Sequence, residues 1–168
     1  MSVDVNEYKD FIQKIVEILP KGAFLTTKDT GKTNTMTIGW GSFGFEWGIP
    51  TAEVMVRQSR HTKVAMDQID EFTLTFPIDG TMKSELSYCG QNSGRNTDKI
   101  SDCNLKIVPA RETDAPVVSC RGIVLECKTL ARLTMDEEST SSEVLDKWYK
   151  AGDLHTMYIA KVIACYEI

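Results

Sequence analysis

Hydrophobic residues near the start of the chain recur every three or four positions, which is the period of a helix with one buried face. Tyr8, Ile12, Ile15 and Leu19 share that face. The Pro-Lys-Gly segment that follows removes a backbone donor and adds a flexible residue. The pattern therefore predicts a first helix over residues 5–19.

After this helix the period shortens to two, and β-branched and aromatic residues become frequent, as is typical of strands. Asp and Gly in residues 28–32 favour a turn, so the strands on either side are expected to form a hairpin. Strands are predicted over residues 23–27, 33–38, 51–56, 71–77, 117–127, 128–135 and 155–166, and further helices over residues 60–70 and 136–149.

Short strands with few helices between them favour a mainly β protein, an antiparallel barrel with peripheral helices. No Gly-x-Gly-x-x-Gly fingerprint follows the first strand, which argues against a dinucleotide-binding Rossmann unit. With 168 residues the chain can bury a core without disulfides or a structural metal. A single domain over residues 1–168 is expected.

Charge and cysteine content exclude several classes of protein. A net charge of -5 argues against a general nucleic-acid binder, which needs clustered Lys and Arg. No apolar run approaches the ~20 residues of a membrane helix, and the first residues lack the apolar core of a signal peptide. Five cysteines, an odd number with no Cys-x-x-Cys pair, favour reduced thiols and a cytoplasmic location.

The most informative stretch of the sequence runs from Thr33 to Thr62. An extended segment with Asn34 at its start leads into a Gly-rich, aromatic-rich segment over residues 39–48. A strand follows and ends in two arginines, a serine, a histidine and a threonine. Backbone edges and apolar side chains suit a flat ring, whereas Arg and hydroxyl groups suit an anion. We therefore expect a flat aromatic ligand that carries a phosphate.

Four aromatic residues stand between glycines in residues 40–48, which are expected to form a loop. They are Trp40, Phe43, Phe45 and Trp47. Two interpretations remain open at this point. The loop packs its aromatic side chains onto the core or a subunit interface, or it forms a lid or wall for a planar ligand.

Residues 57–62, Arg-Gln-Ser-Arg-His-Thr, carry the strongest charge signal. Arg binds phosphate through two parallel hydrogen bonds, and a helix capped by Thr62 would add backbone donors. The alternative is a solvated strand end with surface ion pairs.

A second polar segment, residues 88–100, contains Gly, Asn and Ser and is expected to form a loop with a helical turn near Thr97. Such loops can direct backbone N–H groups at an anion. The alternative is a surface turn capped by Asn and Ser.

The sequence offers little support for nucleophilic catalysis or metal binding. It contains only two histidines, His61 and His155, and no activating signature surrounds Cys89. The histidines and acids lack the spacing of a metal site. No catalytic residue and no metal ligand are predicted.

Several of these segments, taken in order, resemble the flavin reductase-like family of FMN-binding split barrels, which includes flavoredoxin-type proteins of anaerobes. The matching segments are residues 34–37, 40–42, 56–62, 70–73, 89–90, 93–95 and 98–99, with a weaker match at 155–159. The resemblance implies a six-stranded antiparallel split barrel and a homodimer. It also implies non-covalent FMN near the subunit interface.

The resemblance also assigns roles to individual residues. Asn34, Thr35, Met36 and Thr37 would lie along the isoalloxazine, with Gly41 and Ser42 near it; Arg57, Ser59, Arg60, His61 and Thr62 would hold the phosphate; Ser93, Gly94 and Lys99 would close the site, and Cys89 would border it. At Gln58 the chain departs from the proline of the family pattern.

Three hypotheses of function follow. The first is an FMN-dependent oxidoreductase, a flavin reductase that passes electrons from NADH or NADPH through FMN to free flavin or to a redox protein. The second is a non-catalytic FMN protein that carries electrons or stores flavin. The third is a β-barrel interaction module without a cofactor.

Overall fold

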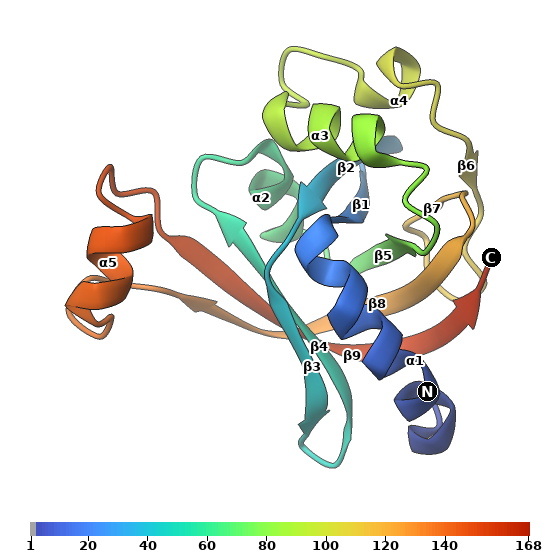
Figure 1. Cartoon of the computed structure of the whole chain (residues 1–168), viewed down its shortest axis with the longest axis horizontal. Coiled ribbons are helices and arrows are strands. Elements are labelled where there is room, and N and C mark those ends of the chain that lie inside the picture. The colour runs from blue at the N-terminus through green and yellow to red at the C-terminus, as the bar shows by residue number, and fades with distance from the viewer. Residues whose placement is uncertain (1–2) are drawn as a thin grey trace.

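The structure is a computed structural model and describes residues 3–168. Its centre is a seven-stranded sheet in the order β2-β1-β5-β8-β9-β4-β3 (Figure 1), in which every neighbouring pair is antiparallel. Its strands are β1 (Ala23–Asp29), β2 (Lys32–Ile38), β3 (Gly41–Glu46), β4 (Ile49–Arg57), β5 (Glu71–Pro77), β8 (Gly122–Thr134) and β9 (His155–Glu167), and β6 (Ile107–Val108) pairs with β7 (Val117–Val118) in a separate small sheet.

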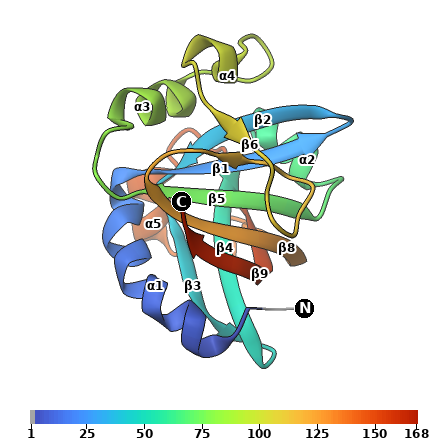
Figure 2. The same cartoon turned by 90° about the vertical axis from the view of Figure 1, so that its right-hand side faces the viewer.

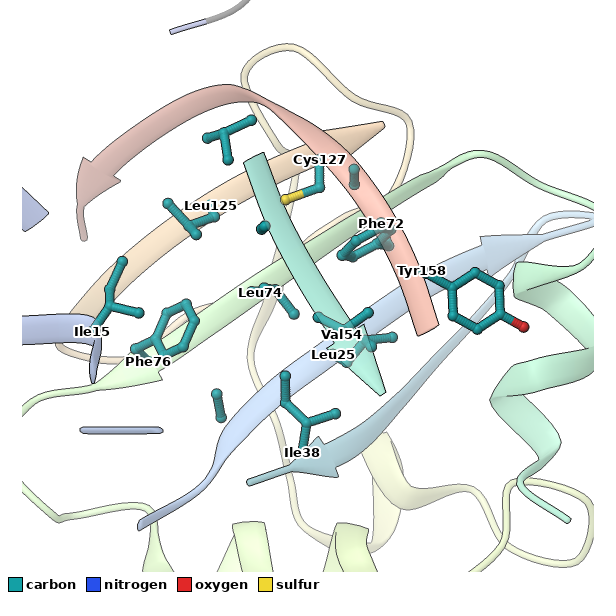
Figure 3. Packing of buried hydrophobic residues seen from close by; sticks show 14 of the residues in the cluster. Ile15, Leu25, Ile38, Val54, Phe72, Leu74, Phe76, Leu125, Cys127 and Tyr158 are labelled. Carbon is teal, nitrogen blue, oxygen red and sulfur yellow. The ribbon is translucent and has the colours of Figure 1, made fainter. Parts of the chain in front are cut away.

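The large sheet curls around one hydrophobic core (Figure 2), and its edge strands β2 and β3 do not pair with each other. Side chains from five strands meet in this core (Figure 3), where Leu25, Val54, Leu74, Leu125 and Tyr158 are fully buried. Removing such side chains from water is the main favourable term in folding. The predicted mainly β, antiparallel split barrel is confirmed, with seven strands in the sheet rather than six.

The predicted first helix is confirmed as α1 (Val5–Ile18), followed by the 3-10 turn η1 (Leu19–Lys21). The side chain of Asp4 caps α1 by accepting a hydrogen bond from the backbone N–H of Asn6, 2.8 Å away. Ile15 is fully buried, and the hydroxyl of Tyr8 donates to the carbonyl oxygen of Thr51. These contacts hold α1 against the barrel.

Four shorter helices surround the barrel. In Figure 2, α3 and α4 lie together beyond β1 and β2, whereas in Figure 1 α5 stands apart at the end of the β8–β9 ribbon. Among the helices of residues 3–168, none combines the length and apolar character that a bilayer crossing requires. They are α2 (His61–Met66), α3 (Lys83–Gln91), α4 (Lys99–Asp102) and α5 (Ser142–Trp148).

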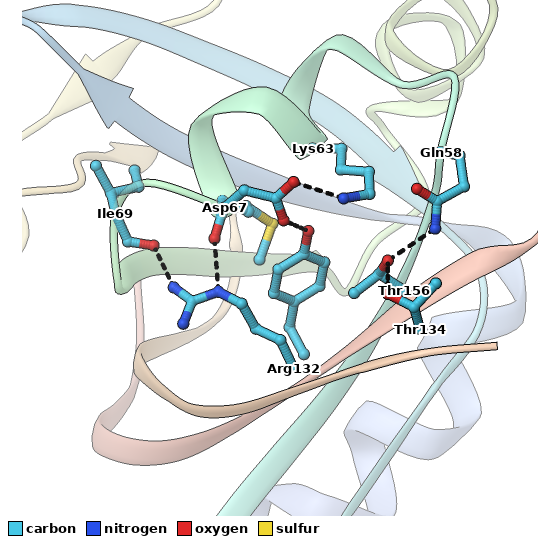
Figure 4. A network of polar contacts seen from close by, with 9 residues as sticks. Gln58, Lys63, Asp67, Ile69, Arg132, Thr134 and Thr156 are labelled. Atoms are coloured by element: carbon cyan, nitrogen blue, oxygen red, sulfur yellow. Dashed lines mark hydrogen bonds and ion pairs between the residues drawn. The ribbon is translucent and has the colours of Figure 1, made fainter.

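A polar network fixes α2 to the β8–β9 ribbon (Figure 4). The carboxylate of Asp67 accepts hydrogen bonds from the hydroxyl of Tyr158, at 2.6 Å, and from the ammonium of Lys63. Arg132 on β8 donates to the carbonyl oxygens of Met66 and Ile69, both at 3.1 Å. The end of α2 therefore has a fixed position relative to the sheet.

Three predicted elements differ from the structure. Residues 41–46 form strand β3 rather than a loop, because they pair along their whole length with β4. The second helix is shorter than residues 60–70, and Arg60, not Thr62, is its N-cap. The last helix starts at Ser142 rather than Asp136, because the Asp136 carboxylate binds the backbone and hydroxyl of Ser139 in a local turn.

Two further differences concern the second half of the chain. Helix α3 is absent from the prediction, because only Leu86 and Cys89 of its residues are buried and the helical period is weak. The strands predicted over residues 117–127 and 128–135 are instead the short β7 and the long β8. A Cβ atom on Gly122 would lie 2.5 Å from the carbonyl oxygen of Phe76, so the glycine permits close contact between β8 and β5.

Candidate functional site

Two adjacent cavities share Met36, Arg57 and Arg60. The first, here called the aromatic cavity, has a volume of about 210 Å³, and the second, the cationic cavity, about 310 Å³. Besides the shared residues, the aromatic cavity is lined by Thr37, Ile38, Gly39, Trp40, Met55 and His155, and the cationic cavity by Ser59, His61, Thr62, Gln91, Asn92, Ser93, Gly94, Arg95, Asn96, Lys99 and Asp153.

Residues 57–62 reach the cationic cavity because β4 ends at Arg57 and α2 begins at His61. The bend between these elements is tied down by Asp153, which precedes β9. Its carboxylate accepts hydrogen bonds from the Ser59 backbone N–H at 2.8 Å and from the Ser59 hydroxyl at 2.6 Å. The Asp153 carboxylate is thus hydrogen-bonded to the loop and not to the neighbouring cations.

Four basic side chains line the cationic cavity, and none of them forms an ion pair with a carboxylate within residues 3–168. Each is held by a neutral backbone carbonyl. Arg57 donates to Asp153 at 2.9 Å, Arg60 to Gly90 at 2.7 Å, Arg95 to Ser59 at 3.4 Å and Lys99 to Cys89 at 3.3 Å. The cavity therefore carries an excess of positive charge.

Lys99 is the most unusual of these cations, because only 5% of its surface is exposed. Burial, together with the nearby Arg60, lowers the pKa of its ammonium group. A buried charge without an opposite charge costs free energy of folding. An anionic ligand in the cavity would offset that cost.

Strand β2, helix α2 and the loop after α3 meet at a closely packed junction. The side-chain amide nitrogen of Asn34, Nδ2, donates to the Thr62 hydroxyl oxygen at 2.8 Å. A Cβ atom on Gly94 would overlap Asn34 Oδ1 and lie 3.0 Å from His61 Cδ2, so any other residue there would displace the Asn34 side chain. Within the described residues, His61 Nδ1 is buried without a hydrogen-bond partner. Burial and the nearby Arg95 lower the pKa of His61.

The aromatic cavity has walls from three strands and from the turn between β2 and β3. Trp40 packs edge-on against Trp148 with ring centroids 4.9 Å apart, and its ring lies 5.5 Å from that of His155. Thr37 is fixed by donating its hydroxyl to the carbonyl oxygen of Leu86 at 2.6 Å. Aromatic faces and methionine side chains favour a flat conjugated ligand.

The four aromatic residues of the segment 40–48 lie in three different surroundings. Trp40 is a wall of the aromatic cavity. Phe43 packs against Phe76 of the core, with ring centroids 5.7 Å apart. Phe45 and Trp47 lie near the tip of the β3–β4 hairpin and are 58% and 65% exposed.

His155 is buried at the start of β9, and its Nδ1 lies 2.6 Å from the hydroxyl oxygen of Tyr149. Burial, with a further contribution from the Arg57 guanidinium, lowers the pKa of His155 to about 4. The imidazole is therefore neutral at physiological pH.

Ten of the predicted cofactor-binding residues line one or both cavities: Met36, Thr37, Arg57, Ser59, Arg60, His61, Thr62, Ser93, Gly94 and Lys99. The sequence segments 34–37 and 57–62 thus meet on one side of the molecule. Whether these residues bind a cofactor stays a prediction.

The other five predicted residues lie beside the cavities. Asn34 borders a neighbouring cavity of about 230 Å³ and contacts Thr62. The Thr35 side chain is buried and donates to the carbonyl oxygen of Leu25, and that of Cys89 is buried in a second hydrophobic cluster. Gly41 and Ser42 lie on β3 opposite β4.

Sequence reasoning missed Trp40, Met55, Arg95, Asp153 and His155 as site residues. Three of these carried a usable signal, since Trp40, Arg95 and His155 stand inside the segments that resemble the family. Met55 and Asp153 carried none. The fold alone brings them to the site, from β4 and from the turn before β9.

Gln58 uses the donor that a proline would lack. Its backbone N–H donates to the carbonyl oxygen of Leu154 at 3.0 Å, and its side chain donates to the Thr156 hydroxyl at 2.9 Å, as Figure 4 shows. The departure from the family pattern therefore adds a link between the end of β4 and β9.

Comparison with solved structures shows the same fold in several flavoproteins. Flavoredoxin from Methanosarcina acetivorans is 24% identical, with 88% of this chain and 68% of that chain covered and a TM-score of 0.66. The FMN-binding protein from Thermus thermophilus is 20% identical, with 87% and 69% covered and a TM-score of 0.68. The NADH:FAD oxidoreductase SgcE6 of Streptomyces globisporus is 15% identical, with 100% and 87% covered and a TM-score of 0.66.

Identities this low establish the fold alone, and no curated protein sequence matches the chain. The family follows from a separate comparison. The model of the flavin reductase like domain matches residues 19–168, which include every strand of the large sheet and all residues of both cavities. The chain therefore belongs to the flavin reductase-like family.

Proposed function

We propose that the protein binds FMN, with the phosphate in the cationic cavity and the ring system in the aromatic cavity. The observation that carries this proposal is the cluster of Arg57, Arg60, Arg95 and Lys99 without paired carboxylates, directly beside a cavity walled by Trp40. A phosphate monoester carries between one and two negative charges near neutral pH and accepts several hydrogen bonds. It matches the charge that the cluster leaves uncompensated.

The fit of FMN is supported by shape as well as charge. The two cavities meet at Met36, Arg57 and Arg60, so a ligand with a ring at one end and an anion at the other can occupy both. Ser59, Thr62 and Ser93 add hydroxyl groups at the anionic end. The Thermus thermophilus protein, named for binding FMN, has the same fold.

The residues of this site position and tune rather than react. Bound FMN would supply the electron-transfer chemistry. Trp40 and Met55 would exclude water from the ring, and the cations would hold the phosphate end. The lack of a catalytic acid, base or nucleophile among the predicted residues fits such a division of labour.

The function that this site supports best is that of a flavin reductase, which passes electrons from NADH or NADPH through FMN to free flavin or to a protein acceptor. The family and the fold shared with an NADH:FAD oxidoreductase support this assignment. A non-catalytic FMN electron carrier is the second candidate, because flavoredoxin has the same fold. Anaerobic addition of NADH or NADPH separates the two: bleaching of the flavin band supports the reductase, and reduction only by a redox partner supports the carrier.

Assembly as a homodimer belongs to the same proposal. Phe45, Trp47, Leu133 and Trp148 are large apolar side chains with about half or more of their surface exposed, and such surface favours association. All five cysteines are free thiols, which fits a reducing compartment such as the cytoplasm. The proposed unit is one domain over residues 1–168.

Arg60→Ala tests the phosphate assignment. Within residues 3–168 the Arg60 guanidinium donates only to the carbonyl oxygen of Gly90, whereas that of Arg57 also donates to the carbonyl oxygen of Trp148, so Arg60 is the cleaner choice. Loss of one charged hydrogen-bonding partner should weaken FMN about 10- to 100-fold and leave riboflavin binding nearly unchanged, because only FMN has the phosphate.

The matched control is Arg121→Ala, since Arg121 is exposed and lines neither cavity. Dissociation constants for FMN and riboflavin are measured by flavin fluorescence quenching. Equal weakening of both ligands by Arg60→Ala would show that the arginine supports the fold, and a colourless protein that binds neither flavin would refute the proposal.

A further inference from the structure

Tyr149 and His155 form a buried pair beside the aromatic cavity. Tyr149 caps the end of α5, and His155 is the first residue of β9. Each is only 6% exposed, and their rings lie nearly perpendicular, at 82°, with centroids 5.5 Å apart. The close packing of the two buried rings fixes the orientation of the imidazole.

The direction of the hydrogen bond between them follows from the surroundings of the Tyr149 hydroxyl. Its oxygen lies 2.6 Å from His155 Nδ1 and 3.6 Å from the sulfur of Met135. A ring nitrogen is a much better acceptor than a thioether sulfur, so the hydroxyl donates to Nδ1. If Nδ1 accepts, the single proton of a neutral imidazole is on Nε2.

The charges around His155 favour its neutral form. Burial and the positive charges of Arg57 and Arg60 oppose a second proton on the imidazole. The negative charge of Asp153 favours that proton, but its effect is smaller than theirs combined. Tyr149, the remaining titratable contact, is itself neutral, since burial raises its pKa. His155 therefore presents one N–H group rather than two.

The Nε2 atom of His155 is the ring nitrogen that Tyr149 leaves free. His155 lines the aromatic cavity together with Trp40 and Met55. Within residues 3–168 no group is hydrogen-bonded to Nε2. Unlike His61 Nδ1, the Nε2 atom is not fully buried. Nε2 is therefore accessible on a ring that borders the aromatic cavity.

We propose that Tyr149 is a positioning residue that holds His155 as the neutral Nε2–H tautomer and thereby gives the aromatic cavity a fixed hydrogen-bond donor. The ligand group it serves is an acceptor atom on a conjugated ring, a carbonyl oxygen or an unprotonated ring nitrogen. Only the identity of that ligand as FMN rests on the proposed function. The tautomer itself is set by Tyr149 and does not depend on a bound ligand.

The experiment reads the tautomer directly. The chain has only two histidines, so ¹⁵N-histidine labelling gives two imidazole spin systems, and His155→Gln assigns them by removing one. Long-range ¹H–¹⁵N spectra of the full-length protein distinguish a protonated ring nitrogen from an unprotonated one. We expect an unprotonated Nδ1 and a protonated Nε2 for His155, unchanged between about pH 5.5 and pH 8, because its charge change lies well below that range.

Tyr149→Phe then removes only the hydroxyl group. We expect the His155 signals to shift toward a mixture of the two tautomers while those of His61 stay in place, and FMN to bind about three- to tenfold more weakly through the lost donor. Tyr88→Phe is the matched control, since its hydroxyl binds Asp102 on the exposed side of α4.

Two results would overturn the proposal: a wild-type His155 protonated on Nδ1, or a Tyr149→Phe spectrum identical to that of the wild type. Unchanged His61 signals ensure that a lost fold is not mistaken for a lost tautomer. The spectra are recorded with and without FMN. The predicted tautomer in a protein that binds no flavin would refute the proposed function and leave the role of Tyr149 intact.

Discussion

The cationic and aromatic cavities are neighbours, yet the chain builds them in different ways. The cationic cavity comes mainly from two short segments, residues 57–62 and 91–99, that each contribute several polar groups. The aromatic cavity collects single residues from β2, β4 and β9 and from the turn at Trp40. A site made of contiguous residues can be found from composition, whereas a site assembled across strands cannot.

The two cavities also differ in what holds their side chains. In the cationic cavity, like charges are kept together by neutral carbonyl oxygens, at an electrostatic cost that only an anion relieves. In the aromatic cavity, rings pack against one another, and this packing is favourable without a ligand. Changes in the first cavity should therefore affect anion binding selectively, and changes in the second should affect the ring.

The largest effect is expected from Gly94→Ala. The added methyl group would overlap the Asn34 side chain, so either Asn34 leaves Thr62 or the loop after α3 moves, and both changes alter the cationic cavity. Overpacking costs about 1–3 kcal/mol, and we expect FMN to bind on the order of 100-fold more weakly. Titration calorimetry measures the change.

Gly44→Ala is the matched control for this substitution, since a Cβ atom at Gly44 meets nothing within 4 Å and Gly44 is not among the glycines with positive φ. Wild-type affinity in Gly94→Ala would mean that the junction of β2, α2 and the loop does not shape the anion site.

Lys99→Met should separate binding from stability. Removal of the buried cation should weaken FMN about 10- to 30-fold, within the range for a charged hydrogen bond. The free energy of unfolding should rise without ligand, because an uncompensated buried charge is gone. Urea denaturation with and without FMN gives both quantities.

Lys106→Met, at an exposed position outside both cavities, is the control for Lys99→Met. A fall in stability of the ligand-free Lys99→Met protein would contradict the view that the cationic cavity is costly to build.

The pH dependence of stability tests the other cavity. Burial lowers the pKa of His155 to about 4, below the ordinary value of 6.5 expected in the unfolded chain. Between these values the unfolded state binds more protons, so stability falls as pH decreases from about 6.5 toward 4, by up to ~1.4 kcal/mol per pH unit. His155→Gln should remove this contribution. Parallel stability curves for the two proteins between pH 4.5 and 6.5 would show that the histidine is not held neutral.

The smallest effect is expected from Trp40→Leu. Loss of one aromatic wall should weaken FMN and riboflavin equally, by about 1 kcal/mol, because both carry the same ring. Val16→Ala, at an exposed position of α1 outside both cavities, is the control and should leave both affinities unchanged. A loss confined to FMN would break the division between a ring cavity and an anion cavity.

The sequence by itself determined the antiparallel β architecture and the charged half of the site. Periods of two and of three to four residues mark strands and α1, because burial selects one face of each element. The segment from Arg57 to Thr62 signals an anion site, because its polar groups are adjacent in the chain. The family resemblance drawn from these segments is confirmed by the match over residues 19–168.

Only the tertiary structure decided which residues face the ligand and how they are held. Thr35 and Cys89 stand within the right segments, but neither lines a cavity: the Thr35 hydroxyl donates to the carbonyl oxygen of Leu25, and the Cys89 side chain lies in a hydrophobic cluster. His155 reaches Trp40 only because β9 pairs with β4, and Tyr149 reaches His155 only because α5 ends beside it. Side-chain direction and long-range strand pairing are set by the packing of the whole barrel, so no local pattern in the sequence encodes them.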